Sequence, residues 1–454
     1  MTIGNDLRRT VGGRVLEPGD DGFEQARRPW NLAVDQPVLA VVDATGADDV
    51  AALVRYASTV GLTITAQPSG HGATGDTEGA VLLRTRALDD LAVRQDARTA
   101  RVGAGVKWGR VQEVAGLHGL TGLAGSSPAV TVTGYTLGGG LSWFGRAYGL
   151  AANSVRAFDV VTADGTPARV TEDSDPELFW ALRGGGGDFA LVTALEFDLH
   201  PAPSLYGGRV LWPAEHAARV LDVYRELTAT APDRLTAWFG LFTFPGGPPL
   251  VGVDVTYLGD PEEARALLRD VDRIEGRLSD TRAPMAIADL GDITAEPVDP
   301  RPGASRTELL TALDDRVAAC LLERPIAPLV TAQVRHLGGA FTRPEDTAAG
   351  HIDEPYALYL YGIPGDGVRE RQTAIADSVG QYTTGRKPLT QLAAGEHVSR
   401  AFSTDTLARL RAVKAARDPH GVFRSNFPVG SPHSTQDQSP GIDTAAAASS
   451  RRTA

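Results

Sequence analysis

The sequence predicts an α+β protein of two domains, and three observations support this prediction. The chain has 454 residues, which is more than one hydrophobic core normally holds. Residues 38–83 contain short apolar strands on either side of a helical segment, which is the pattern of a βαβ unit. Residues 250–257 alternate apolar and polar side chains, which is typical of an antiparallel strand with one face on the core.

The first domain can be followed element by element. A buried strand is expected at 38–42, and Thr45 is a candidate N-cap for the helix after it. A second strand covers 62–66. The remaining elements of this domain are strands at 81–83, 100–106 and 190–199, a helix at 108–115, and a short helix that Asp175 caps before Pro176.

The pattern changes after the prolines at 201–203. Strands are expected at 250–257, 330–337 and 356–363, with helices at 217–227 and 262–271, and a last helix at 404–416 returns to the first domain. The predicted domains are therefore 1–205 with 395–430, and 206–394. The tail 431–454 is rich in Ser, Thr, Gln and Ala, and this composition predicts disorder.

Composition limits the function. The formal net charge of −12 argues against nucleic acid and anionic membranes as partners. No apolar run of 18 residues occurs, and the first 14 residues lack a signal-like apolar stretch, so we expect a cytoplasmic protein. The single cysteine, Cys320, and the scattered histidines indicate no metal site.

A histidine between glycines is the most distinctive motif. His71 lies in Gln67-Pro68-Ser69-Gly70-His71-Gly72-Ala73-Thr74-Gly75, directly after the strand at 62–66. Glycine permits positive φ and lets backbone N–H groups approach a ligand. Further glycine-rich stretches follow at 125–140 and 184–187, and Asp418-Pro419-His420-Gly421 precedes Asn426 near the end.

In this order, together with Arg28-Pro29-Trp30-Asn31, these motifs resemble the FAD-linked oxidases of the berberine bridge enzyme group, bacterial type. That group belongs to the vanillyl-alcohol oxidase and p-cresol methylhydroxylase superfamily. The resemblance covers about residues 23–430. It implies a two-domain vanillyl-alcohol-oxidase-like flavoprotein, in which an FAD-binding domain faces an antiparallel-sheet substrate domain.

The resemblance also implies a set of residues that bind FAD. His71 would join the flavin 8α-methyl group, and Ser127 stands where many members carry a second linking cysteine, so a single covalent link is expected. The stretch 134–140 would cradle the pyrophosphate, and Asn426 would approach the pyrimidine edge of the isoalloxazine. The other expected FAD-binding residues are Pro68, Ser69, Gly70, Gly72, Gly75, Gly125, Pro128, Thr133, Gly134, Thr136, Gly138, Asn153 and Val192.

The catalytic base is where the sequence departs from the family. The resemblance implies a Tyr-Leu-Asn-Phe-like segment, but here Pro388 and Thr390 replace the tyrosine and the asparagine. Substitute bases are Tyr359 and Tyr361, which share one strand face by the period of two, or Tyr135. An unperturbed tyrosine has a pKa of about 10, so it would need help, which Arg335 and His336 on a neighbouring strand could supply.

The preferred function is that of an FAD-dependent oxidase. A base would remove a proton from a small organic or secondary-metabolite substrate while hydride passes to the covalently bound flavin, and O2 would reoxidise the flavin. Two alternatives remain open on the sequence. One is a flavin-dependent cyclase without net redox change, which the missing tyrosine at 388 suggests. The other is a flavin-loaded binding protein that does not turn over.

Overall fold

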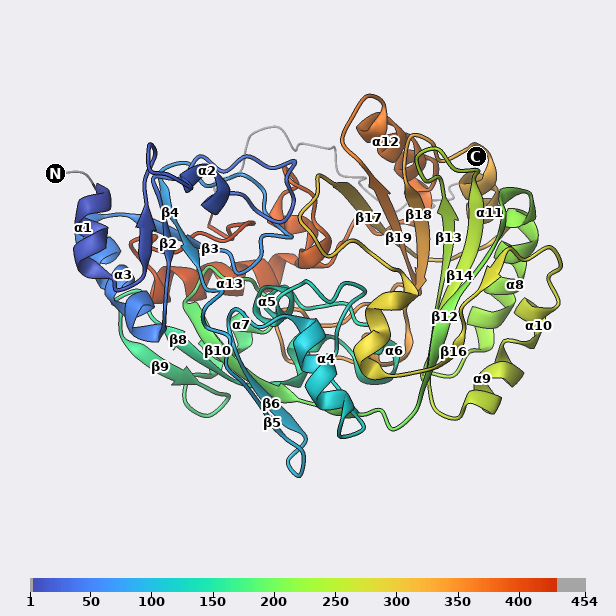
Figure 1. The fold of residues 1–454 in the computed structure, drawn as a ribbon, viewed down its shortest axis with the longest axis horizontal. Coiled ribbons are helices and arrows are strands. Elements are labelled where there is room, and N and C mark those ends of the chain that lie inside the picture. Colours follow the sequence, from blue (N-terminus) through green and yellow to red (C-terminus); the bar gives the residue numbers. More distant parts are fainter. Residues whose placement is uncertain (1–2, 431–454) are drawn as a thin grey trace, which may run out of the picture.

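The computed structural model describes residues 3–430, and these form two parts that lie side by side along the long axis (Figure 1). One part holds the N-terminal half and the last helix, and the other holds a large antiparallel sheet with its helices. The tail at 431–454, for which the sequence predicts disorder, lies outside the described residues. The domain boundaries themselves stay a prediction.

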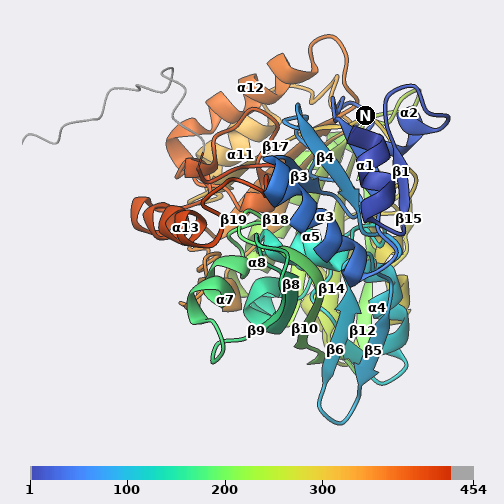
Figure 2. The same ribbon diagram turned by 90° about the vertical axis from the view of Figure 1, so that its left-hand side faces the viewer.

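The first sheet contains the predicted βαβ unit. Its strand order is β1-β2-β4-β3, with β4 parallel to both β2 and β3. Its elements are α1 (Ile3–Thr10), β1 (Arg14–Leu16), α2 (Phe23–Ala26), β2 (Ala40–Asp43), α3 (Ala47–Val60), β3 (Thr63–Ala66) and β4 (Ala80–Arg84). Figure 2 looks onto the end of the molecule that carries α1 and α3. The predicted cap is wrong by one residue: Gly46 is the N-cap, and Thr45 instead donates its hydroxyl to Asp49 of the first turn.

The second sheet has the order β5-β6-β10-β8-β9 and is antiparallel throughout. Its strands are β5 (Leu91–Arg94), β6 (Thr99–Gly103), β8 (Val155–Val161), β9 (Pro167–Val170) and β10 (Leu191–Asp198). The helices of this region are α4 (Trp108–Gly116), α5 (Val132–Leu137), α6 (Gly145–Tyr148), α7 (Pro176–Leu182) and α13 (Thr404–Arg417). The predicted cap of α7 is confirmed, because the Asp175 carboxylate accepts a hydrogen bond from the N–H of Leu178 at 3.1 Å. Two further short strands, β7 (Leu120–Thr121) and β11 (His200–Pro201), form a separate antiparallel pair.

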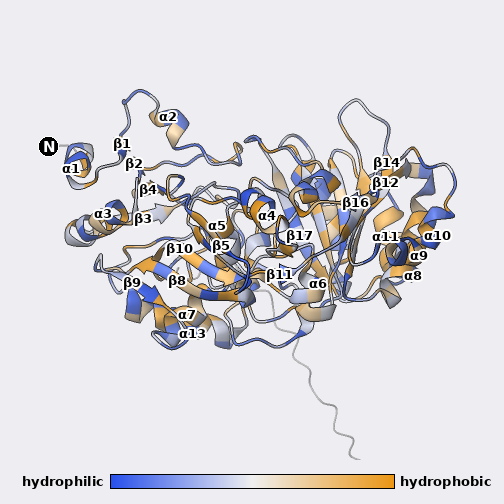
Figure 3. Ribbon diagram, turned by 60° about the horizontal axis from the view of Figure 1, so that its bottom comes forward, coloured by the Kyte–Doolittle hydropathy of each residue, from blue (hydrophilic) through white to orange (hydrophobic). Residues whose placement is uncertain are grey.

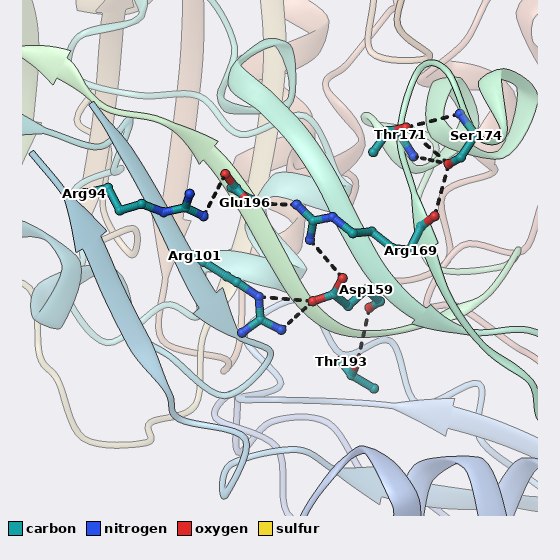
Figure 4. A network of polar contacts seen from close by, with 8 residues as sticks. All are labelled: Arg94, Arg101, Asp159, Arg169, Thr171, Ser174, Thr193 and Glu196. Carbon is teal, nitrogen blue, oxygen red and sulfur yellow. Dashed lines mark hydrogen bonds and ion pairs between the residues drawn. The ribbon is translucent and has the colours of Figure 1, made fainter. Parts of the chain in front are cut away.

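One face of the second sheet carries a ladder of alternating charges, to which each of its five strands contributes one side chain (Figure 4). The ladder runs Arg94, Glu196, Arg169, Asp159 and Arg101. Its central guanidinium, that of Arg169, lies 2.7 Å from Glu196 and 3.0 Å from Asp159. These partly exposed ion pairs let a polar sheet face stand in water, at about 0–1 kcal/mol of stabilisation for each pair.

The third sheet has the order β15-β12-β14-β13-β18-β19-β17, with β16 also paired to β12. Its strands are β12 (Leu205–Pro213), β13 (Leu235–Phe242), β14 (Leu250–Leu258), β15 (Ser279–Asp280), β16 (Ala283–Met285), β17 (Ala304–Leu310), β18 (Thr331–His336) and β19 (Tyr356–Gly362). Helices α8 (Ala217–Thr230), α9 (Pro261–Leu267), α10 (Arg269–Asp272), α11 (Asp315–Leu322) and α12 (Val368–Ser378) lie on its outer side (Figure 1). Figure 3 shows both hydrophobic and hydrophilic residues along α8, α9 and α11, as expected for helices with one face on a sheet.

The chain also contains seven short 3₁₀ helices within residues 3–430. They are η1 (Ala151–Ser154), η2 (Ala214–His216), η3 (Ile287–Ile293), η4 (Gly339–Thr342), η5 (Gly380–Tyr382), η6 (Leu389–Gln391) and η7 (Val398–Arg400). The helix expected at 262–271 is divided, because α9 ends at Leu267 and α10 starts at Arg269.

The inner face of the third sheet is turned toward the first part of the molecule. Strand β14 was expected to expose Gly252, Asp254 and Thr256, but all three are buried. The expectation of a half-buried strand is therefore wrong, and the reason is tertiary: the helices cover one face and the rest of the chain covers the other. The buried Asp254 keeps its charge compensated by the guanidinium of Arg209.

A buried arginine joins the two parts, and the end of the chain closes the first part. Arg146 of α6 is buried and donates to the carbonyl oxygens of Ala231, Leu235 and Leu337 on the sheet side. After α13, Phe423 forms a parallel bridge with Ile64 of β3. The last segment thus returns to the strand that leads into the His71 loop.

Candidate active site

The His71 loop follows β3 in a tight turn that requires glycine. Gly70 has φ +82°, and a Cβ at this position would lie 2.8 Å from Cβ of Pro29, so a larger residue would not fit. The His71 ring stacks on Trp30 with 4.2 Å between ring centroids and 16° between the planes. Its Nδ1 lies 2.9 Å from the hydroxyl of Ser69. The loop therefore fixes both the position and the orientation of the imidazole.

The imidazole is neutral at ordinary pH. Burial lowers the pKa of His71 to about 4, and the positive charge of Lys107 acts in the same direction. An Nδ1–H that donates to Ser69 leaves a lone pair on Nε2. This Nε2 is buried, and no residue within 3–430 hydrogen-bonds to it. A neutral imidazole with one free nitrogen is the form that can attack an electrophile.

The C-terminal segment reaches the same loop. The amide nitrogen of Asn426 lies 3.6 Å from the position that a Cβ of Gly72 would take. The hydroxyl of Thr74 donates to the backbone oxygen of Asn426 at 3.2 Å. Asn426 and His71 were chosen from motifs some 350 residues apart, and the fold brings them together.

The glycine-rich stretch at 125–140 is only partly a loop. Residues 132–137 form α5, so Gly134 lies in a helix and is exposed, and the expected continuous loop at 134–140 is wrong. The helix instead presents Thr133, Tyr135 and Thr136. Their hydroxyl oxygens are buried, and none has a hydrogen-bond partner in the part of the chain that the structure describes.

The other expected cofactor residues are distributed around these two segments. A Cβ on Gly125 would lie 3.4 Å from the ring of Tyr135, and a Cβ on Gly138 would meet the methyl group of Thr390. The Ser127 hydroxyl accepts a hydrogen bond from the N–H of Ala129. The remaining residues lie as follows. Pro128 packs beside Gly109, and Asn153 accepts a hydrogen bond from the hydroxyl of Thr347 at 3.1 Å. Gly75 adopts φ +86° beside Asp35, Val192 is buried in β10 opposite Val160, and Pro68 is half-buried within the His71 loop.

An aromatic and cationic column crosses the inner face of the third sheet. Trp143, from the first part, stacks on Trp238 of β13 at 3.5 Å between ring centroids. The guanidinium carbon of Arg335 lies 4.2 Å from the Trp238 centroid and 4.3 Å from that of Tyr359. Tyr361 continues the column with its ring 12° from the plane of Tyr359. We refer to these five residues as the stacked column.

The structure distinguishes between Arg335 and His336, the two residues expected to assist a tyrosine that acts as a base. Arg335 covers the ring of Tyr359, as the sequence suggested. His336 points the other way, because neighbours on a strand face opposite sides, and it packs on Tyr356. The expected role of His336 is therefore wrong.

The tyrosines of the site are weaker acids than free tyrosine, because their pKa values are raised. Burial raises the pKa of Tyr359, and the positive charge of Arg335 only partly offsets this rise. Burial likewise raises the pKa of Tyr135 well above its ordinary value, and burial raises that of Tyr361. Each phenol is therefore protonated in the resting protein. A base role requires the phenolate, so the phenolic proton must first pass to solvent, and the positive charge of Arg335 favours that form of Tyr359.

The segment that departs from the family pattern still lies at the site. Gln391 accepts a hydrogen bond from the hydroxyl of Thr307 at 2.9 Å, and Thr307 is the β17 partner of Tyr359. Lys387 is fully buried between the carboxylates of Glu308 and Glu396. These contacts anchor the segment on the inner sheet face although Pro388 provides no phenol.

The residues present suit a large polar cofactor. Buried polar atoms without partners cost free energy, so native proteins rarely keep them except where a ligand binds. Here four of them, His71 Nε2, Thr133 Oγ1, Tyr135 Oη and Thr136 Oγ1, occur on the two segments that the sequence assigned to FAD. Among residues 3–430, no group of three or more His, Cys, Asp or Glu side chains could hold a metal ion. No helix in that range is long and apolar enough to span a membrane.

Comparisons with known proteins show an FAD binding domain and FAD-linked relatives. The model of the FAD binding domain family matches residues 38–171. (R)-6-hydroxynicotine oxidase of Paenarthrobacter nicotinovorans is 27% identical over 451 residues, which cover 92% of this chain and 97% of the relative. The structure of a Physcomitrella patens BBE-like 1 variant superposes with a TM-score of 0.83 at 21% identity, covering 95% of this chain and 100% of that one. Glucooligosaccharide oxidase of Acremonium strictum, described with a 6-S-cysteinyl, 8α-N1-histidyl FAD, gives 0.79 at 20% identity, covering 93% and 98%.

The fold and the site together define an FAD-dependent oxidoreductase of the oxidase type. Its cofactor is FAD, as the sequence predicted. The chain carries an FAD binding domain and is homologous to FAD-linked oxidases such as (R)-6-hydroxynicotine oxidase, which agrees with the resemblance to the berberine bridge enzyme group in the sequence. The predicted fold class is confirmed with it.

Sequence reasoning missed several residues of the site. Trp30 was part of a quoted motif, but its stacking on His71 could not be read from it. Lys107 influences His71 from the start of α4, which no motif marks. Trp238, Gln333 and Asp254 lie on the face of Arg335 and Tyr359 only because of the strand register. Strand periodicity predicts on which face of its own strand each side chain lies. Only the pairing register between strands shows that these side chains are neighbours.

Proposed function

We propose that this protein oxidises a small organic substrate and holds its FAD through one covalent bond to Nε2 of His71. When bound, FAD supplies the two-electron acceptor that takes hydride from the substrate and passes the electrons to O2. The observation that carries the proposal is the neutral, oriented imidazole of His71, whose Nδ1 is engaged by Ser69 and whose Nε2 is free. Ser127 offers no thiol for a second bond.

The chain's own residues would then do the following. Asn426 would donate hydrogen bonds to the edge of the flavin ring, and Thr133 and Thr136 would hold the cofactor through their buried hydroxyls. In its phenolate form, which the positive charge of Arg335 over its ring favours, Tyr359 would accept the substrate proton. The stacked column would close the substrate side against water, which strengthens these interactions.

The linkage is tested by mass spectrometry of denatured protein. Wild-type chain should retain one FAD on the peptide that contains His71. His71→Ala should release its FAD on acid precipitation, because no other residue provides the bond. His118→Ala, at an exposed position, is the matched control and should keep the flavin. Covalent FAD retained in His71→Ala would falsify the assignment.

The reaction class is tested separately with an anaerobic flavin spectrum. Bleaching of the absorbance by a candidate metabolite, followed by recovery and hydrogen peroxide formation in air, is expected of an oxidase. Product formation without bleaching or oxygen uptake would contradict oxidation and support a cyclisation.

A further inference from the structure

Arg335 is oriented but not neutralised, and this points to a ligand. Its Nε donates to the side-chain oxygen of Gln333 at 2.8 Å. The rings of Trp238 and Tyr359 both pack on it, with centroids 4.2 and 4.3 Å from the guanidinium carbon. The residue as a whole is partly exposed, and within residues 3–430 its two terminal amino groups make no hydrogen bond and are not fully buried. The edge that carries them is therefore the part of the guanidinium left for a ligand.

The nearby acids do not take this charge. Asp254 is held by Arg209 through two hydrogen bonds, one of them 2.9 Å long, and it also accepts from Gln333 at 3.2 Å. Arg209, Asp254, Gln333 and Arg335 thus form one relay in which the first two compensate each other. Glu296 lies close enough for its charge to act on Arg335. No carboxylate among residues 3–430 comes within 4.0 Å of the Arg335 guanidinium as an ion pair.

The shape of the opening selects the ligand chemistry. With two aromatic rings packed on the guanidinium and its Nε engaged by Gln333, the terminal N–H groups are the donors that remain for a partner. A carboxylate matches this fork with two parallel hydrogen bonds. We propose that Arg335 binds a carboxylate of the substrate, so that the substrate of this oxidase is an organic acid. This inference rests on the proposed function, because it assumes that the bound acid is the substrate. Binding of an acid to Arg335 can nevertheless be measured without turnover.

The position of Arg335 suits this role. It lies in the middle of the stacked column, between the phenol proposed as base and the two tryptophans at the boundary of the two parts. A carboxylate held at the guanidinium edge would fix one end of the molecule beside Tyr359. The length of the acid would then decide which C–H bond lies at the reaction position, which makes Arg335 a determinant of substrate choice.

The test is calorimetry on the FAD-loaded protein with a panel of probes. Acetate, phenylacetate, benzoate and cinnamate are each compared with the corresponding amide and with inorganic phosphate. At least one acid should bind at least tenfold more tightly than its amide and than phosphate. Arg335→Gln should lose at least tenfold of that affinity, and Arg335→Lys should recover part of it because it keeps the charge but not the fork.

Two further variants make the result specific. Arg234→Gln removes an exposed guanidinium that stacks on Tyr257, and it should leave acid binding unchanged. Glu296→Gln removes a nearby negative charge and should tighten acid binding. Flavin absorbance and FAD content show that each variant is folded and loaded.

The proposal is overturned if no acid binds better than its amide, or if Arg335→Gln keeps the wild-type affinity. Equal binding of phosphate would overturn the carboxylate assignment. These outcomes are distinct from a failure of the proposed function, which would appear as chain without FAD or as flavin that no substrate reduces.

Discussion

At Tyr359 a guanidinium covers the partly buried phenol, and this arrangement makes it the first candidate for the base. Tyr359→Phe should slow flavin reduction by about 10²–10⁴-fold, the usual contribution of general-base catalysis. FAD content should stay normal. Because burial raises the pKa of Tyr359, the rate in the wild type should increase with pH, and this dependence should be lost in the variant. Stopped-flow reduction across pH measures both.

Tyr361→Phe is the matched comparison on the same strand. Its hydroxyl contacts the backbone oxygen of Pro302 at 3.4 Å, so a smaller effect is expected. A wild-type rate in both variants would remove these tyrosines from the mechanism. Tyr135, whose hydroxyl is buried without a partner, would then be the remaining phenol to test.

Asn426 allows a second prediction about single residues. Asn426→Ala should weaken the noncovalent binding of FAD or shift the flavin absorbance. The reason is that each side-chain hydrogen bond contributes roughly 0.5–1.5 kcal/mol. Spectra of the purified variant, and the FAD content of the double variant with His71→Ala, provide the measurement. Asn5→Ala, on α1, should leave both unchanged. An unaltered spectrum and content in the Asn426 variants would show that its amide does not touch the ring.

These residues also show how far sequence reasoning reached. His71 and Asn426 could be predicted because each stands in a local motif. The stacked column could not, because it needs Trp143 of one part and four residues on three strands of the other. No local pattern encodes a contact between segments that meet only in the folded state.

Among the elements, α7 offers a clean measurement. Asp175 accepts from the N–H of Leu178 and pairs with Arg417 of α13 at 2.7 Å. Asp175→Ala should lower the free energy of unfolding by about 0.5–2 kcal/mol through loss of the cap. Asp173→Ala, exposed two residues earlier, should change it by less than about 0.5 kcal/mol. Equal stability losses in both variants would show that the charge, and not the cap, matters.

Element positions were largely predictable, and their surroundings were not. The periodicity placed β14, β18 and β19 to within one or two residues. It also placed one face of β14 in water, which is wrong, because alternation cannot tell a solvent-facing polar side chain from one that meets a buried partner. Asp254 illustrates this: it looks like a surface residue in the sequence and is an internal one in the fold.

For the whole molecule, buried histidines predict a loss of stability in mild acid. Burial lowers the pKa of His200 to about 4, and burial together with the charge of Arg146 lowers that of His336 to about 3. Between those values and about 6.5, the unfolded chain binds more protons than the folded one, so stability falls as pH decreases from about 6.5. Each histidine contributes up to about 1.4 kcal/mol per pH unit.

Urea unfolding between pH 7 and 5 measures this slope. His200→Gln and His336→Gln should each flatten it, whereas His118→Gln, at an exposed site, should not. The buried Asp188 and Asp254, whose pKa values burial raises, act in the opposite sense, so the comparison of histidine variants isolates the imidazoles. A slope that is identical in all four proteins would contradict the prediction.

The return of the chain to β3 has a consequence for biosynthesis. Thr63 of β3 hydrogen-bonds to the backbone of Gly421, 358 residues later, and Ile64 pairs with Phe423. At about 5–20 residues per second, a ribosome needs roughly 20–70 seconds to make the intervening chain. During that interval the strand that carries the His71 loop lacks its neighbour, and the nascent first domain has an open edge. Attachment of the cofactor is therefore expected late, after release of the chain, and the exposed edge makes the growing polypeptide a natural client for chaperones.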